Sequence, residues 1–163
     1  MIYIKLYAVF TRYLWYMKKV HIAFETIIEA SVEQVWTVLS DFDCYPEWSP
    51  TVKRFSEQPQ VGQSVKVRLE QPGGMGITMK PKILKLEPLS EIRWRGILGI
   101  KGLFDGEHYF LLEPLGKGQT RFIQGEYFSG LLVPFFRNMI EGNTSKGFKL
   151  FNNALKERAE AYK

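Results

Sequence analysis

The amino-acid sequence predicts an α+β fold, in which a curved antiparallel sheet of about six or seven strands wraps around one long C-terminal helix. Residues 134–163 repeat apolar side chains at steps of three and four, which is the spacing of one helical face. Between residues 50 and 130, short alternating segments are separated by glycine and proline, as in antiparallel strands joined by turns. We therefore expect the sheet to supply the apolar surface that the helix needs.

A strand and two short helices are expected before the main run of strands. Residues 21–30 alternate between two faces, which predicts the first strand. A capping-box pattern at Ser31 predicts a helix that ends near Asp41. Pro46 and Pro50 bound a second, shorter helix, because proline interrupts regular structure on either side of it.

The other strands are expected from alternation and from the turns between them. They cover residues 52–57, 64–70, 77–86, 91–97, 104–113 and 120–128.

The turn of the last hairpin predicts its register. If Pro114 pairs with Thr120, His108 lies directly opposite Glu126. The preceding strand then brings Trp94 into the same row. A shift of one residue would turn each side chain to the other face of the sheet.

The long helix is expected to start at Pro134, whose fixed φ and missing N–H suit a first turn. Gly142 and Gly147 lie inside it, although glycine costs about 1 kcal/mol relative to alanine in a helix. Two interpretations are open. The glycines allow a bend or close packing of the helix backbone on the sheet, or they leave space for a ligand.

Composition indicates one soluble globular domain, since the 163 residues are 45% hydrophobic and 24% charged. The net charge of +5 is concentrated at the N-terminus. Four of the 22 basic residues lie in the first nineteen positions without an acidic residue, and the remaining eighteen nearly balance 17 acidic residues. This distribution argues against nucleic acid as a partner.

A single cysteine, Cys44, excludes an internal disulfide and, without a histidine cluster, a zinc site. It is interpreted as a small hydrophobic or inert surface residue. The composition fits a reducing compartment, and we expect a cytoplasmic protein.

The first nineteen residues are expected to form a basic, aromatic extension before a domain at residues 20–163. Lys5 and Arg12 interrupt an apolar run that is already too short to span a membrane. Three interpretations are open. Met17 starts the essential domain, the segment packs on the domain as an extra element, or residues 1–16 contact a membrane surface.

Catalytic motifs are missing from the rest of the chain. No serine lies in a nucleophile elbow, and the glycine-rich stretch at residues 72–76 lacks the context of a phosphate-binding loop. Arg93 and Arg95 are expected to be solvated, on the face opposite Trp94. No metal or cofactor is predicted.

Three stretches resemble the START and polyketide cyclase-like (SRPBCC) superfamily, which has the helix-grip fold of the birch-pollen allergen. They are IEASVEQVWTVLSDFDCYPEWSP at 28–50, GLFDGEHYFLLEP at 102–114 and FIQGEYFSGLLVPFF at 122–136. The resemblance implies a deep apolar cavity between the C-terminal helix and the curved sheet. Members bind lipids, sterols, polyketides or other hydrophobic molecules, a minority are cyclases or dehydratases, and no catalytic motif is common to all.

The expected function is therefore a binding or carrier protein for a hydrophobic small molecule or lipid. One alternative is a cyclase or dehydratase that uses His108 and Glu126 as an acid–base pair; the same pair could instead orient a ligand or be purely structural. Another is an adaptor that docks on a membrane or partner. The residues expected at the ligand are Trp36, Trp94, His108, Phe110, Gln124, Glu126, Phe128, Phe136, Met139, Ile140, Asn143, Gly147 and Phe151.

Overall fold

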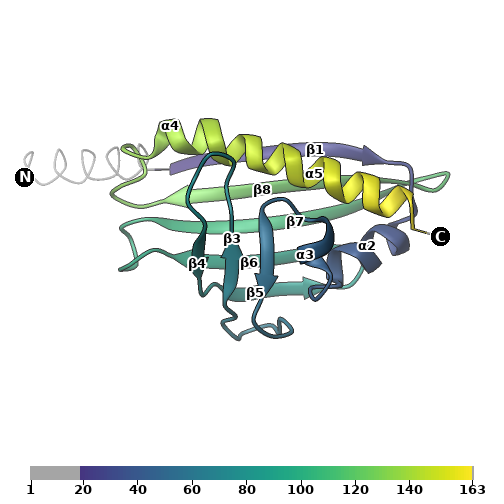
Figure 1. Cartoon of the computed structure of the whole chain (residues 1–163), viewed down its shortest axis with the longest axis horizontal. Coiled ribbons are helices and arrows are strands. Elements are labelled where there is room, and N and C mark those ends of the chain that lie inside the picture. The colour runs from purple at the N-terminus through teal and green to yellow at the C-terminus, as the bar shows by residue number, and fades with distance from the viewer. Residues whose placement is uncertain (1–18, 163) are drawn as a thin grey trace, which may run out of the picture.

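The computed structural model describes residues 19–162 and has the expected α+β architecture (Figure 1). In chain order its elements are β1 (Lys19–Ile28), α2 (Val32–Ser40), α3 (Tyr45–Trp48), β2 (Val52–Phe55), β3 (Val67–Leu69), β4 (Ile77–Met79), β5 (Lys82–Glu87), β6 (Glu91–Ile97), β7 (Asp105–Gly116), β8 (Gln119–Ser129), α4 (Arg137–Met139), the π-helical turn η1 (Ile140–Thr144) and α5 (Ser145–Glu160). The interpretations of residues 1–18 fall outside the described residues, and the boundary at residue 20 stays a prediction.

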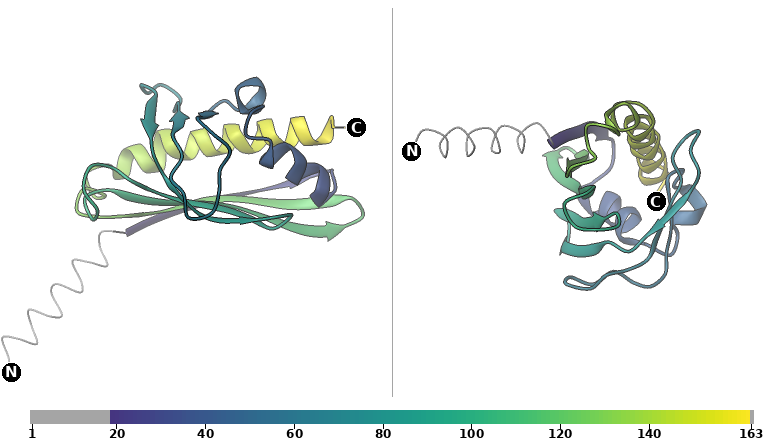
Figure 2. Two further views of the ribbon diagram at one scale, coloured as in Figure 1. Left: turned by 90° about the horizontal axis from the view of Figure 1, so that it is seen from below. Right: turned by 90° about the vertical axis from the view of Figure 1, so that its left-hand side faces the viewer.

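The strands of residues 19–162 form two sheets. The larger is antiparallel with the order β1–β8–β7–β6–β5, and the smaller has the order β2–β3–β4. Helix α5 crosses one face of the large sheet, and α2, α3 and the small sheet lie on the same side (Figure 2). The enclosed space of the domain therefore lies between the large sheet on one side and α5, the short helices and the small sheet on the other (Figure 2).

The start of the domain follows the predicted local signals. The backbone N–H of Gln34 donates to the Ser31 hydroxyl at 3.3 Å, and the Ser31 N–H donates to the Gln34 side chain at 3.0 Å. This reciprocal pair satisfies donors that a helix N-terminus leaves without partners. The second helix is also confirmed, at Tyr45–Trp48.

The expectation of one strand over residues 77–86 is wrong. The segment is divided at Lys80 and Pro81 into β4, which pairs with β3, and β5, which pairs with β6. Proline has no N–H for a strand ladder, so it suits a change from one sheet to another. The strand expected at residues 64–70 is likewise shorter, at Val67–Leu69.

The long helix begins later than predicted. Residues 131–136 form turns, and the helix proper starts at Arg137. At η1 the helix widens: the Ser145 N–H bonds to the carbonyl of Ile140, five residues earlier, and the Ser145 hydroxyl donates to the same oxygen at 3.0 Å. A π turn holds more residues than an α turn, so it changes which side chains face the sheet.

Three predicted site residues of the helical face, Phe136, Met139 and Asn143, are exposed. Phe136 still meets Phe104 edge-on, with ring centroids 5.3 Å apart. The ligand-binding role of these three residues stays a prediction. Phe148 and Asn152, which the predicted set did not include, are buried in α5.

Buried apolar side chains form two clusters. In the main one, the rings of Phe110 and Phe151 stack with centroids 5.1 Å apart. The smaller cluster contains Phe128, Val133 and Ile140, near the start of the long helix. Along the inner face of β8, Gln124 and Glu126 lie between Phe122 of the main cluster and Phe128 of the smaller one. A polar row thus separates the two parts of the core.

Candidate functional site

The predicted register of the last hairpin is confirmed. Pro114 pairs with Thr120, and His108 is the direct partner of Glu126. Trp94 of β6 is the direct partner of His108 on its other side. Side chains from three neighbouring strands therefore form one row on the face that α5 covers.

His108 is held on all sides within this row. It is buried, its ring is stacked on Trp94, and its edges contact two polar groups. Nδ1 lies 3.4 Å from Oε2 of Glu126, and Nε2 lies 3.2 Å from the amide nitrogen of Gln124. An amide N–H donates, so the neutral tautomer that fits both contacts accepts at Nε2 and has its proton on Nδ1, facing the carboxylate.

A cavity of about 40 Å³ lies where the large sheet, the small sheet and α5 meet. Its walls are Thr51, Val52, Leu69, Gln71, Met79, Trp94, Gly96, Gly106, His108, Gln124, Glu126 and Phe148. The space suits a very small number of water molecules. A cavity therefore lies between the sheet and the helix, where the resemblance implies one. It is small and not deep, and one of its walls is polar.

Two buried oxygens at the cavity have no hydrogen-bond partner among the described residues. They are Oε1 of Gln124, a residue that is 1% exposed, and Oε1 of Gln71. An acceptor that is removed from water without a partner costs free energy. The cavity therefore favours a guest that carries a hydrogen-bond donor.

Two inner-face glycines make room at the cavity. A Cβ on Gly106 would lie 2.2 Å from Oε1 of Glu126, and a Cβ on Gly96 would lie 2.1 Å from the terminal methyl of Met79. Gly106 therefore leaves space for the carboxylate. Met79, a flexible side chain from β4, fills the hollow over Gly96.

The structure brings together four of the predicted site residues, Trp94, His108, Gln124 and Glu126, at the cavity. Phe110 touches this group through ring contacts with both Trp94 and His108.

The other predicted residues lie further away. Phe151 packs in the main cluster, Trp36 packs at its margin, and Phe128 and Ile140 belong to the smaller cluster. Gly147 is placed for close packing, since a Cβ there would lie 2.2 Å from Oε1 of Gln71. The ligand-binding role of each of these residues stays a prediction.

Sequence reasoning missed Gln71, Met79 and Phe148. Met79 reaches the cavity from β4, and Gln71 reaches it from the connection between β3 and β4. The separation of this small sheet from the large one depends on the break at Pro81. Phe148 lies three residues before Phe151 in α5, a spacing that fits the predicted face. Pro81 is the one signal in the sequence that could have indicated the second sheet.

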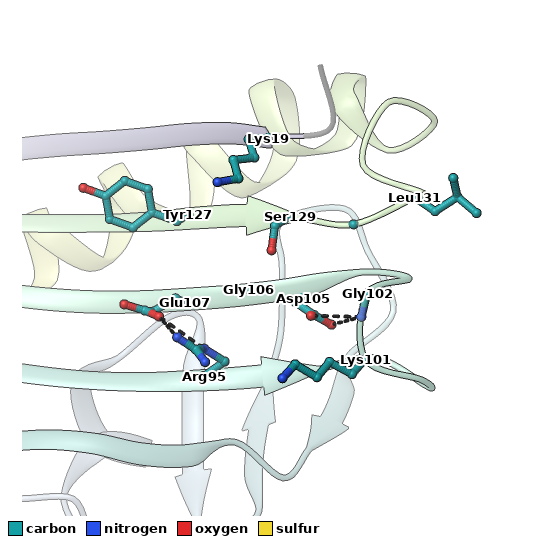
Figure 3. A pocket seen from close by; sticks show the side chains of 11 residues that line it. Lys19, Arg95, Lys101, Gly102, Asp105, Gly106, Glu107, Tyr127, Ser129 and Leu131 are labelled. Atoms are coloured by element: carbon teal, nitrogen blue, oxygen red, sulfur yellow. Dashed lines mark hydrogen bonds and ion pairs between the residues drawn. The ribbon is translucent and has the colours of Figure 1, made fainter. Parts of the chain in front are cut away.

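A larger, open depression of about 460 Å³ lies on the opposite face of the large sheet, near the ends of β7 and β8 (Figure 3). Two of its charged groups bond within the protein: Arg95 pairs with Glu107, and the Asp105 carboxylate accepts from the Gly102 N–H at 3.0 Å. The depression is open to solvent, so the buried cavity at His108 is the better candidate for a ligand site.

Among residues 19–162, no group of three or more His, Cys, Asp or Glu is placed to hold a metal ion, and no helix is long and apolar enough to cross a bilayer. The pKa of the Cys44 thiol is raised to about 11, chiefly by hydrogen bonding to Asp41. The thiol is therefore protonated at neutral pH.

A curved sheet that grips one long helix, with a cavity between them, defines the helix-grip class of domain. The chain belongs to the family described as polyketide cyclase / dehydrase and lipid transport, whose family model matches residues 19–160. The resemblance to the START and polyketide cyclase-like superfamily is thereby confirmed. A sequence search of curated proteins gave no match.

Solved structures share the fold at low sequence identity. The Zhui aromatase/cyclase from Streptomyces sp. R1128 superposes with a TM-score of 0.72 at 19% identity, covering 87% of this chain and 94% of that one. A START superfamily protein from Mycobacterium smegmatis gives 0.69 at 20% identity, with 86% and 97% covered. Norcoclaurine synthase from Thalictrum flavum, in complex with dopamine and hydroxybenzaldehyde, gives 0.68 at 17% identity, with 89% and 88% covered.

Proposed function

We propose that this chain binds a small hydrophobic molecule that carries a hydrogen-bond donor, and that it acts as a binding or carrier protein. The molecule lies between β6, β7, β8 and α5, with its donor directed at the polar side chains of Gln124, His108 and Glu126. The observation that carries the proposal is Oε1 of Gln124, which is buried at the cavity beside His108 and has no hydrogen-bond partner within residues 19–162.

The surroundings of Gln124 support an apolar guest with one polar end. Trp94 and Phe148 supply aromatic walls, and Gln124, His108 and Glu126 supply a compact set of polar atoms. Sites for small molecules commonly combine a mostly apolar lining with a few fixed polar groups.

The volume of about 40 Å³ requires side chains to move when the guest enters. Met79, in β4, and Gln71, in the connection between β3 and β4, are the candidates, because both side chains are flexible. If Met79 moves, the space over Gly96 is added to the cavity, and if Gln71 moves, the space beside Gly147 is added.

Naphthol and naphthalene, one with a hydroxyl donor and one without, test the proposal. We expect the protein to bind naphthol about tenfold or more tightly than naphthalene, because only naphthol satisfies the buried acceptor. Gln124→Leu should remove this preference and leave naphthalene binding in place. Gln63→Leu, the same change at an exposed position, should alter neither affinity. If neither compound binds, or if Gln124→Leu keeps the preference, the proposal is wrong.

A second candidate is cyclase or dehydratase chemistry at His108, favoured by the contact between Nδ1 and Glu126. With Nδ1–H facing a carboxylate, Nε2 has the lone pair of a general base. Gln124 now occupies that lone pair, so a substrate would have to displace its amide. In deuterated water, the base would take a C–H proton from benzoylacetone and return deuterium to the enolate. Catalysed exchange that is lost in His108→Gln would support this activity, and exchange equal to the buffer rate would exclude it for this probe.

A further inference from the structure

One end of the domain exposes a group of large apolar side chains. Leu98 and Ile100, in the loop between β6 and β7, are 56% and 72% exposed. Leu131 and Phe135, which follow β8, are 50% and 81% exposed, and Met139 is 43% exposed. These five residues are called the apolar tip.

The backbone joins the two loops of the apolar tip into one surface. The N–H groups of Leu131 and Leu132 donate to the carbonyls of Gly102 and Leu103, both at 2.9 Å. Figure 3 shows Lys101 and Leu131 on these neighbouring loops, with the Leu131 side chain directed away from the sheet. The apolar side chains therefore have a fixed base, and they do not depend on a ligand for their position.

The charges around the tip are mixed, and Lys101 is a cation that stays exposed among them. Segments 97–105 and 130–141 contain Lys101 and Arg137 beside Asp105 and Glu141. Arg137 is paired with Glu141 at 2.7 Å, whereas Lys101 is exposed and has no ion-pair partner among residues 19–162. Exposed apolar groups beside lysine are typical of surfaces that enter the boundary of an anionic bilayer.

The chain enters the domain at the same end. Lys19 pairs with Ser129, two residues before Leu131. The eighteen residues before Lys19 carry Lys5, Arg12 and Lys18 and no acid. Because the segment and Lys101 have the same sign of charge, the charges do not favour the segment as the cover of the tip, and they favour an anionic partner for both.

We propose that the apolar tip docks this domain on the surface of an anionic lipid bilayer, with Leu98, Ile100, Leu131 and Phe135 entering the interface and Lys101 at the headgroups. The same end carries the candidate ligand site, since Gly96 at the cavity directly precedes Ile97. A docked domain thus holds the cavity close to the bilayer. The docking itself does not require the proposed ligand binding.

The test uses the full chain and sedimentation with two kinds of vesicle, one of phosphatidylcholine alone and one in which phosphatidylglycerol replaces part of it. We expect binding to the anionic vesicles that weakens as salt is added. The combined variant Ile100→Ser, Leu131→Ser and Phe135→Ser should lower the partition coefficient about tenfold or more. Lys101→Glu should lower it several-fold on anionic vesicles only.

Leu115→Ser is the matched control, because Leu115 is 44% exposed at the opposite end of β7. It should bind vesicles like the unmodified chain. Circular dichroism and thermal unfolding check that all variants fold. Vesicle binding that the triple variant retains in full would place the interaction in residues 1–18 and overturn the proposal. Absence of vesicle binding would also overturn the proposal. If the tip variants then change only the self-association of the protein, the tip is covered by a second copy of the chain and not by a bilayer.

Discussion

The imidazole of His108 and the indole of Trp94 lie face to face across β7 and β6, with centroids 4.8 Å apart and planes 5° from parallel. Phe110 and Phe148 meet the imidazole edge-on, with centroids 4.8 and 5.0 Å away. The ring therefore cannot turn without disturbing its neighbours. This packing fixes the directions of its two nitrogens toward Glu126 and Gln124, in a core that is otherwise aromatic.

Met79→Ala is expected to enlarge the ligand space. Removal of the side chain over Gly96 should strengthen naphthol and naphthalene binding several-fold and lower the free energy of unfolding by about 1 to 2 kcal/mol. Titration calorimetry and urea unfolding measure the two effects. Met75→Ala, on an adjoining turn and 93% exposed, should change neither. Weaker binding in Met79→Ala would show that Met79 is part of the binding surface and not an obstacle.

The two glycines of the long helix are expected to respond to alanine by different amounts. At Gly142 an added Cβ meets nothing within 4 Å among the described residues. Gly142→Ala should therefore raise the free energy of unfolding by about 0.5 to 1 kcal/mol. Gly147→Ala should raise it by less, because the same gain in helix propensity is offset by the displacement of the Gln71 side chain and by the tight contact with Thr51. Urea unfolding of both variants tests this pair, and an equal or larger gain in Gly147→Ala would contradict the role of close packing.

Cys44 is expected to react slowly with iodoacetamide at pH 7. Its raised pKa, about 11, leaves less thiolate than an ordinary cysteine has. The alkylation rate at pH 7 should therefore be lower than that of an ordinary exposed cysteine by a factor on the order of ten, and the rate should still be rising above pH 9. Asp41→Asn should increase the rate at neutral pH, because it removes the carboxylate that stabilises the thiol. Mass spectrometry over time measures the alkylation. A rate that levels off near pH 8 would contradict this account.

The ion pairs on the outer face of the large sheet should make stability depend on pH. Burial raises the pKa of Glu91, but hydrogen bonds from Lys85 and Arg93 outweigh it, so the pKa is lowered from 4.5. A lowered folded-state pKa stabilises the protein above pH 4.5, and this contribution is lost as the pH falls through the folded value. Glu91→Gln should thus cost about 2 kcal/mol at pH 7 and progressively less below pH 4.5. Urea unfolding at several pH values measures this difference, and a cost that is constant with pH would contradict it.

The parts of the fold that local chemistry determines could be predicted from the sequence. The hairpin register depends on a short turn, where Lys117 and Gly118 adopt φ values of 55° and 74°. That turn fixes which residues meet along two whole strands, including His108 and Glu126. The capping box at Ser31 is local in the same sense.

The parts that depend on distant packing could not be predicted. A period of 3.6 residues predicts one continuous face for the long helix, and this period does not hold across the π turn at Ile140–Thr144. The cavity volume depends on how Met79, Gln71 and Phe148, from separate elements, share the space over the glycines. A family resemblance indicates where such a space lies but does not determine how much of it side chains fill.

The wide turn at Ile140–Thr144 has a consequence for how this helix can change. An α-helix of fixed pitch transmits any insertion along its whole length, so its two ends must keep one common phase. Here the extra residue is taken up within a single turn, between Arg137–Met139, which is exposed, and Ser145–Glu160, which the core holds. Substitution or rotation in the first segment can therefore proceed without moving Phe148 or Phe151, and the end of the domain beside the tip can diverge while the grip on the sheet is preserved.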